Sequence, residues 1–281
     1  NILSHGRLEP GKMFLVDMNK GRIINDDEIK NKITTKRPYG KWIKDQMIEL
    51  KDIPYSKENQ LKESISLKTR QRLYNYTTED IQEIITPMAQ HSKEAIGSMG
   101  SDTPLAVLSE KTQLIYNYFK QLFAQVTNPP LDGIREEIVT DISLSLGHDK
   151  NLFDISSRQC RKLKIQNPVI SNRDLHKIRQ IDSKGFKSRT IKILYNKSKG
   201  LNGIEDSLDR IINEVERSID EGCNIIILSD KNANKTNAPI PALLACSFVH
   251  HSLNKRRKRS YFDIIIESAE PREPHHFASL F

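Results

Sequence analysis

Residues Cys223 to Leu228 (CNIIIL) form a continuous apolar run of strand length in the last third of the chain. Similar runs occur at residues 190–195 (TIKILY) and 261–266 (YFDIII), and segments with helical apolar spacing, 204–222 and 239–253, separate the three. Strands that are apolar on both faces and alternate with helices are typical of a parallel sheet covered on both sides. The sequence therefore predicts an α/β fold with a largely parallel β-α-β sheet.

The loops that follow these strands are the first candidates for contacts. Right-handed crossovers place the carboxyl ends of parallel strands at one edge of the sheet, where ligands and partners of α/β proteins bind. We therefore expect residues 196–203, 229–238 and 267–276 to share that edge.

Upstream of the sheet the sequence predicts a helical connector. Residues 13–17 and 22–24, joined by the turn at Asn19 to Gly21, are expected to form a hairpin, and the acidic stretch 25–28 suits a helix start. A Lys-rich, polar stretch from 30 to 68 is expected to hold short helices. The longer helices expected from apolar spacing and helix breakers cover residues 77–88, with a bend at Pro87, 111–125 and 134–146.

Composition excludes some classes of protein. The 281 residues carry 44 Lys and Arg against 36 Asp and Glu, a formal charge of +8, and no apolar run is long enough to span a membrane. The cysteines Cys160, Cys223 and Cys246 are too scattered to predict a disulfide framework or a CxxC metal site, which favours a reduced compartment. The chain opens on Asn1 without a signal peptide, so we expect it to be an internal piece of a longer polypeptide.

Three local patterns have both a functional and a structural interpretation. Gly97 to Pro104 combines two glycines, three hydroxyls and an acid, so it suits either a small polar guest or an ordinary tight loop, and it matches no phosphate-binding motif. Residues 267–276 resemble a metal cluster in composition, but their spacing favours a strand-end loop with ion pairs. The basic run 255–259 lacks aromatic residues and favours a solvated turn over a nucleic-acid surface.

Several longer strings resemble glutamate synthase. The segment 9–17 with 21–24 resembles the end of its glutamine amidotransferase domain. The strings around Arg37-Pro38-Tyr39 and at 97–108, 118–130, 167–170, 227–230, 238–245 and 267–277 resemble its central domain, in order and over almost the whole chain. This sequence differs from the usual family residues at Ser101, Lys231 and Ala269. These differences affect only the expected geometry of loops.

The resemblance implies a function for the complete enzyme. Glutamate synthase forms two glutamates from glutamine and 2-oxoglutarate, and ammonia passes through an internal tunnel to a synthase domain that holds FMN and a 3Fe–4S cluster. Electrons come from ferredoxin or from NADPH, the latter through an NADPH-oxidising subunit. Residues 1–35 are then expected to end the amidotransferase domain, and residues 36–281 to form a central domain truncated at its carboxyl side. The alternative is a non-catalytic scaffold or interaction module derived from that enzyme.

The resemblance assigns no catalytic, cofactor-binding or metal-binding residue to this chain, so a fragment alone is expected to be inactive. It places the ammonia tunnel or an interdomain contact at Ser98, Gly100, Ser101, Asp102 and Thr103. Neither nucleic acid nor membrane is expected as a partner. The Lys-, Ile- and Asn-rich composition, typical of AT-rich genomes, favours the ferredoxin-dependent type in a chloroplast stroma, with a bacterial cytoplasm as the alternative.

Overall fold

A four-stranded sheet forms the centre of the molecule. The computed structural model describes residue 2 and residues 5–56, 65–95, 105–119, 126–183 and 185–281. The strand order is β11 (Asp263–Glu267), β9 (Ile225–Ser229), β7 (Phe186–Lys192) and β6 (Asp182–Ser183). Strands β7, β9 and β11 are parallel, and only β6 at the edge is antiparallel. The predicted parallel β-α-β sheet is confirmed.

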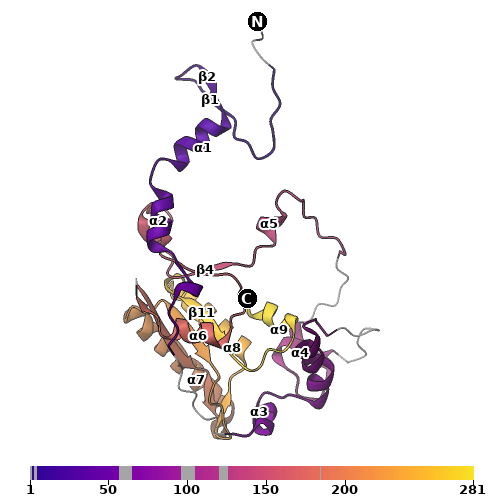
Figure 1. Ribbon diagram of the computed structural model, residues 1–281. Coiled ribbons are helices and arrows are strands. Elements are labelled where there is room, and N and C mark those ends of the chain that lie inside the picture. Colours follow the sequence, from indigo (N-terminus) through magenta and orange to yellow (C-terminus); the bar gives the residue numbers. More distant parts are fainter. Residues whose placement is uncertain (1, 3–4, 57–64, 96–104, 120–125, 184) are drawn as a thin grey trace.

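Both faces of this sheet are covered, because its apolar strands alternate between two cores. Ile226 and Leu228 of β9 pack against α7 (Gly200–Asp220) and α8 (Ala242–Lys255), the two crossover helices. Ile225 and Ile227 of the same strand pack on the opposite side. All four are fully buried, and burial of this kind contributes about 1.5–3 kcal/mol per side chain. Figure 1 shows α7 and α8 together with the sheet in the lower part of the molecule.

The opposite face is covered by α6 (Asn172–Arg179) and by a small sheet. This sheet has the order β3 (Ile48–Glu49), β5 (Leu163–Ile165) and β4 (Leu144–Leu146), with β3 and β5 parallel and β4 antiparallel. Ser171 caps α6 by accepting from the backbone N–H of Asp174 (3.1 Å). Strand β3 lies in the predicted connector 30–68, so the connector takes part in the α/β core.

The apolar run 190–195 is not one strand. The sheet pairing of β7 ends at Lys192, and β8 (Leu194–Asn196) pairs instead with β10 (Asn237–Pro239). The break lies at Ile193, whose N–H bonds to the Ser229 carbonyl while its carbonyl accepts from Ile240. Because residues 237–239 are used in β10, the next helix, α8, begins at Ala242 rather than at the predicted Pro239.

The predicted helix over 134–146 is largely wrong. The chain forms only the short helix α5 (Glu136–Val139), and then Asp141 ends it by accepting from the N–H of Ser143 (2.8 Å). Leu144–Leu146 forms β4, in which buried Leu146 lies opposite Leu163. Ile134 and Ile138, in contrast, stay exposed, so a helix here has no core to pack against.

Two other helical predictions need correction. Residues 77–88 begin as expected, with Thr77 capping Asp80, but continue as a π-helix (Asp80–Ile85) and then as α4 (Thr86–His91). Pro87 has no N–H, and its ring conflicts with the carbonyl four residues earlier, so the wider turn accommodates the predicted bend. Within the predicted helix 111–125, the described residues form a 3₁₀-helix over Ile115–Phe119, while residues 120–125 lie outside the described part.

The N-terminal segment projects away from the α/β body, as Figure 1 shows. It holds the predicted hairpin, β1 (Leu15–Asp17) with β2 (Arg22–Ile24), and the predicted helix start, α1 (Asp26–Thr34), followed by α2 (Tyr39–Gln46). The remaining elements are α3 (Leu67–Leu73), α9 (Pro274–Leu280) and 3₁₀-turns at Leu50–Asp52, Ala106–Leu108, Ser157–Cys160, Lys197–Lys199 and Arg259–Tyr261. In the described part of the chain no helix combines the length and apolar character needed to cross a membrane.

Candidate functional site

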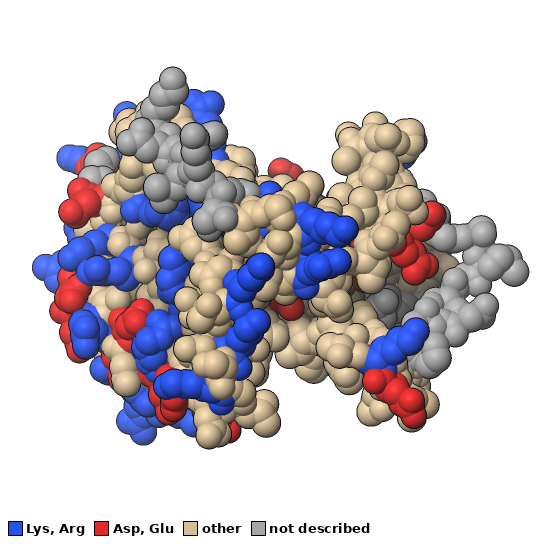
Figure 2. Space-filling view, turned by 90° about the horizontal axis from the view of Figure 1, so that it is seen from below, with Lys and Arg blue, Asp and Glu red and all other residues tan. Residues whose placement is uncertain are grey.

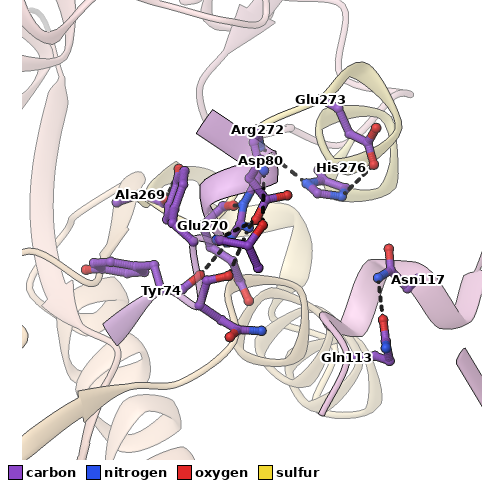
Figure 3. Close-up of polar contacts among 12 residues, drawn as sticks. Tyr74, Asp80, Gln113, Asn117, Ala269, Glu270, Arg272, Glu273 and His276 are labelled. Atoms are coloured by element: carbon purple, nitrogen blue, oxygen red, sulfur yellow. Dashed lines mark hydrogen bonds and ion pairs between the residues drawn. The ribbon is translucent and has the colours of Figure 1, made fainter. Parts of the chain in front are cut away.

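The carboxyl edge of the parallel sheet gathers buried and half-buried polar side chains from four separate parts of the chain. They are Tyr74 and Asp80 from the connector, Tyr116 from the 3₁₀-helix Ile115–Phe119, Asp230 after β9, and Glu270, Arg272 and His276 after β11. We call this set the edge junction. Figure 3 shows several of its members converging from different elements. The predicted meeting of loops 229–238 and 267–276 at this edge is confirmed.

Parallel pairing brings the ends of β9 and β11 side by side. Ser229 lies opposite Glu267, and its hydroxyl donates to Oε2 of that carboxylate (2.5 Å). Arg179 of α6 lies 2.9 Å from the same oxygen. Burial opposes ionisation of Glu267, but these two contacts outweigh it and lower the pKa of the carboxyl group. The strand ends are thereby joined by charge-assisted hydrogen bonds.

Asp230 follows directly and is buried. Its Oδ2 accepts from the Ser268 hydroxyl (2.5 Å) and from the N–H of Ala269 (3.2 Å). Burial raises the pKa of Asp230 to about 6, although these hydrogen bonds act in the opposite direction. The nearby Glu270 carboxylate also raises it. Asp230 therefore fixes the loop after β11 while retaining a proton more readily than an exposed aspartate.

Glu270 binds the start of helix α8. Its Oε2 accepts from the N–H of Ala242 (2.8 Å), the first residue of α8, and from the phenol of Tyr116 (3.3 Å). The positive end of the helix dipole favours a carboxylate here. Burial nevertheless raises the pKa of Glu270, and burial beside Glu270 also raises the pKa of Tyr116. One side chain thus ties α8 to the segment that contains Tyr116.

Arg272 joins the edge to the connector, and its side chain is only 2% exposed. Its guanidinium donates to Oδ2 of Asp80 (2.6 Å) and to the carbonyls of Asn75 (3.1 Å) and Tyr74. It also lies over the ring of Tyr76, 3.9 Å from the centroid, at cation–π distance. The planar fork of an arginine suits several acceptors at once, so this one residue fixes the connector from Tyr74 to Asp80.

His276 completes the junction at the start of α9. Its ring stacks on that of Tyr116, with centroids 4.5 Å apart. Its Nδ1 accepts from the N–H of Arg272 (3.2 Å), which leaves Nε2 to face Glu273 at 3.1 Å. His275 contacts the Tyr116 carbonyl (3.0 Å). Residues 270–276 therefore hold two segments that are distant in sequence, around Tyr74 and around Tyr116.

The arrangement positions chain segments rather than activating a nucleophile. Each charged or phenolic group described above is engaged with another part of the same chain. Loop 267–276 carries ion pairs, from Glu267 to Arg179 and from Arg272 to Asp80, as the favoured interpretation of its sequence predicts. Among the described residues, no three His, Cys, Asp or Glu side chains lie close enough together to hold a metal ion.

The predicted tunnel residues are not part of this geometry. Ser98, Gly100, Ser101, Asp102 and Thr103 lie within residues 96–104, outside the described part of the chain. The edge junction holds the segments on either side of them in the sequence. The third predicted edge loop, 196–203, meets the second one, because the backbone N–H of Lys197 donates to the Thr236 carbonyl (3.1 Å) and β8 pairs with β10.

Sequence reasoning did not identify Tyr74, Asp80, Tyr116 or Asp230 as site residues. Tyr116 and Glu270 are 154 positions apart, so no spacing could have linked them. One available signal was the arginine at position 272 in a loop otherwise rich in acids and prolines.

The basic run 255–259 forms a turn, as its sequence favours, and Arg256 and Lys258 pair with Glu216.

Comparison with known proteins places these features in context. The family model "Glutamate synthase central domain" matches residues 69–281, and "Glutamine amidotransferases class-II" matches residues 1–42. The sequence is 43% identical to the glutamate synthase [NADPH] large chain of Bacillus subtilis and 37% identical to the ferredoxin-dependent glutamate synthase of Pyropia yezoensis. It is 32% identical to the chloroplastic ferredoxin-dependent enzyme of Spinacia oleracea. These alignments cover 99% or more of this chain but only 17–18% of the relatives.

Proposed function

Because this chain belongs to the glutamate synthase central domain family, we propose that it is the linking region of a glutamate synthase. That enzyme forms two glutamates from glutamine and 2-oxoglutarate. The observation that carries the proposal is the order of the matches, amidotransferase over 1–42 and central domain over 69–281 in one chain. We place the boundary near residue 35, so that residues 36–281 belong to the central domain.

The proposed role of the region is to hold two active sites in register and to help enclose the path of ammonia. Ammonia released into water is protonated and loses its nucleophilicity, so a closed path serves the reaction. The edge junction supports this role because Glu270, Arg272 and His276 attach the connector to the sheet on both sides of residues 96–104 in the sequence. A rigid body of this kind preserves the geometry between distant sites.

The tunnel proposal is tested at Thr103. In the complete enzyme, Thr103→Trp is expected to leave glutamine hydrolysis active while the glutamate yield falls from about two toward one per glutamine, because released ammonia is lost. Lys255→Trp, at an exposed position of α8, serves as the control and should keep the normal yield. An unchanged yield in Thr103→Trp contradicts a tunnel at Ser98, Gly100, Ser101, Asp102 and Thr103.

We assign FMN and the 3Fe–4S cluster to the complete enzyme and not to this chain. A cluster needs convergent thiolates. Cys160 lies in a 3₁₀-turn, Cys223 precedes β9 and Cys246 lies in α8, and no metal-binding group of His, Cys, Asp or Glu forms in the described part. These residues do not fit the cluster.

We propose ferredoxin as the electron donor and a plastid stroma as the location. The ground is the Lys-, Ile- and Asn-rich composition, which is typical of AT-rich genomes. NADPH and a bacterial cytoplasm form a second candidate, because identity to the Bacillus subtilis NADPH-type chain is 43% against 37% for the Pyropia yezoensis ferredoxin type. Glutamate formation by the complete enzyme, measured with reduced ferredoxin and with NADPH in parallel, decides between them. Absence of glutaminase and synthase activity with both would favour the scaffold alternative.

A further inference from the structure

A cavity of about 430 Å³ lies at the amino edge of the parallel sheet, opposite the edge junction. The residues that lead into three strands line it: Gly185 before β7, residues 222–224 before β9, and Tyr261 before β11. Its other wall is formed by His148, Lys150, Arg158 and Arg161, from the segment that leads from β4 to β5. The volume falls in the range of small-molecule sites, about 300–1,000 Å³.

The walls of this cavity are rich in cations. Lys150, Arg158 and Arg161 all line it, and in the described part of the chain none of them has a carboxylate at ion-pair distance. Figure 2 shows that elsewhere on the α/β body Lys and Arg are interspersed with Asp and Glu. Three cations without acidic partners around one hollow create a positive potential that favours anions.

His148 adds a neutral donor. The Lys150 ammonium donates to its Nδ1 (2.9 Å), so Nε2 carries the proton, and the ring packs on Tyr261 with centroids 4.7 Å apart. Burial and the neighbouring Lys150 lower the pKa of His148. Arg161 lies close to Gly185, where an added Cβ would come within 2.6 Å of its Nη1. The cavity thus presents several N–H donors.

The negative groups near the cavity are already engaged. Helix α7 ends at its wall, but the Ser218 and Ile219 carbonyls accept from the N–H groups of Cys223 and Gly222, and the Glu221 carbonyl accepts from Lys187. The Glu221 carboxylate pairs with Arg189. The remaining acids nearby are Asp149, paired with Lys162 (2.6 Å), and Asp263, which accepts from the N–H of Gly147. The positive charge of the cavity walls is therefore not neutralised internally.

We propose that this cavity binds a compact phosphate-bearing anion, either inorganic pyrophosphate or the phosphate end of a nucleotide. Guanidinium forks, an ammonium and an imidazole N–H supply donors in several directions, which suits a tetrahedral group with three or more acceptor oxygens better than a planar carboxylate. The site is independent of the proposed tunnel, and it lies at the edge of the sheet opposite to the one that holds the edge junction.

The test is calorimetric titration of the complete polypeptide that carries this chain, with pyrophosphate and with ATP as separate probes. Saturable binding of one or both probes is expected. Tighter binding of pyrophosphate identifies a free phosphate compound as the ligand, and tighter binding of ATP identifies a nucleotide. Arg158→Gln and Lys150→Gln should each weaken binding at least tenfold. Both positions lie at or near the surface, so the variants are expected to fold, which far-UV circular dichroism verifies.

Two controls separate a built site from general charge attraction. Lys235→Gln, an exposed lysine in the loop at the other edge of the sheet, removes the same charge and should change the affinity less than twofold. Citrate, a carboxylate trianion, should bind at least tenfold more weakly than the tighter phosphate probe. Absence of saturable binding, equal binding of citrate, or equal losses in Lys235→Gln and Arg158→Gln would overturn the proposal.

Discussion

Arg272 and Asp80 form an ion pair with Nη1 2.6 Å from Oδ2, although 192 positions separate them in the sequence. The pair connects the loop after the last parallel strand to the start of the π-helix Asp80–Ile85. Since the arginine side chain is almost wholly buried, its remaining N–H groups must also be satisfied, and the carbonyls of Tyr74 and Asn75 accept from them. The attachment of residues 74–80 to the edge of the sheet therefore depends in part on one guanidinium group.

Replacement of this guanidinium tests that dependence. Arg272→Lys keeps the charge but loses the planar fork, so at least one buried carbonyl loses its donor, and the free energy of unfolding should fall by about 2 kcal/mol or more. The control is Arg256→Lys, because Arg256 pairs with Glu216 at the surface. This variant should change the free energy of unfolding by less than about 1 kcal/mol. Urea unfolding of both variants measures the difference, and equal losses would argue against the junction.

The helix contact of Glu270 gives a second prediction. Glu270→Ala leaves the Ala242 N–H and the Tyr116 hydroxyl without their acceptor, and we expect a loss of about 1–3 kcal/mol. Glu270→Gln keeps an acceptor oxygen and should lose less. The order of midpoints in urea, wild type above Gln and Gln above Ala, is the expected result. A Gln variant as unstable as the Ala variant would show that shape and hydrogen bonding do not explain the role of Glu270.

The raised pKa of the buried Asp230 carboxyl group should make the stability of the fold depend on pH. Its pKa is about 6 in the folded chain against 3.8 for an ordinary aspartate. As the pH rises from about 4 to 6, the unfolded chain releases this proton first, so the folded state binds more protons and stability falls over that window. The shift corresponds to a decrease on the order of 3 kcal/mol.

The Asp230→Asn variant isolates this contribution, because an amide does not titrate but still offers an oxygen to Ser268 and Ala269. The stability of the variant relative to wild type should rise between pH 4 and pH 7, and then remain level. Unfolding free energies measured in urea at several pH values provide the comparison. A difference that stays constant across the window would exclude the burial-driven shift.

Two helical glycines form a matched pair for packing. An added Cβ at Gly203 in α7 would lie 2.7 Å from the Asn196 carbonyl oxygen and 2.9 Å from Cβ of Lys199, whereas one at Gly40 in α2 would meet nothing within 4 Å. Gly203→Ala should therefore destabilise the protein despite the helix propensity of alanine. Gly40→Ala should stabilise it by about 0.5–1 kcal/mol. Thermal unfolding of the two variants should shift in opposite directions, and shifts of the same sign would contradict the close approach at Gly203.

Much of the fold was predictable because its signals are local. The apolar run 225–228 and the helix that ends near Gly222 follow from residue type and spacing alone, and both occur as predicted. The prediction failed where a segment had two suitable conformations. Residues 144–146 form a strand because Leu163 and its neighbours lie alongside, and periodicity within the segment gives no information about that partner.

The candidate site was less predictable than the fold. The loop 267–276 stood out by composition, and its interpretation as a strand-end loop with ion pairs agrees with the structure. Its partners Tyr74, Asp80 and Tyr116 could not be identified, because hydrogen bonds between segments that far apart leave no trace in local pattern.

The sequence by itself determined the parallel β-α-β arrangement and the family of the chain, since apolar periodicity and long specific strings are properties of neighbouring residues. Only the tertiary structure decided that the edge of the sheet is a buried junction around Arg272 and that the opposite edge encloses a cavity lined by cations. The physical reason is that burial and charge pairing depend on which distant segments pack together, and that packing depends on the whole chain.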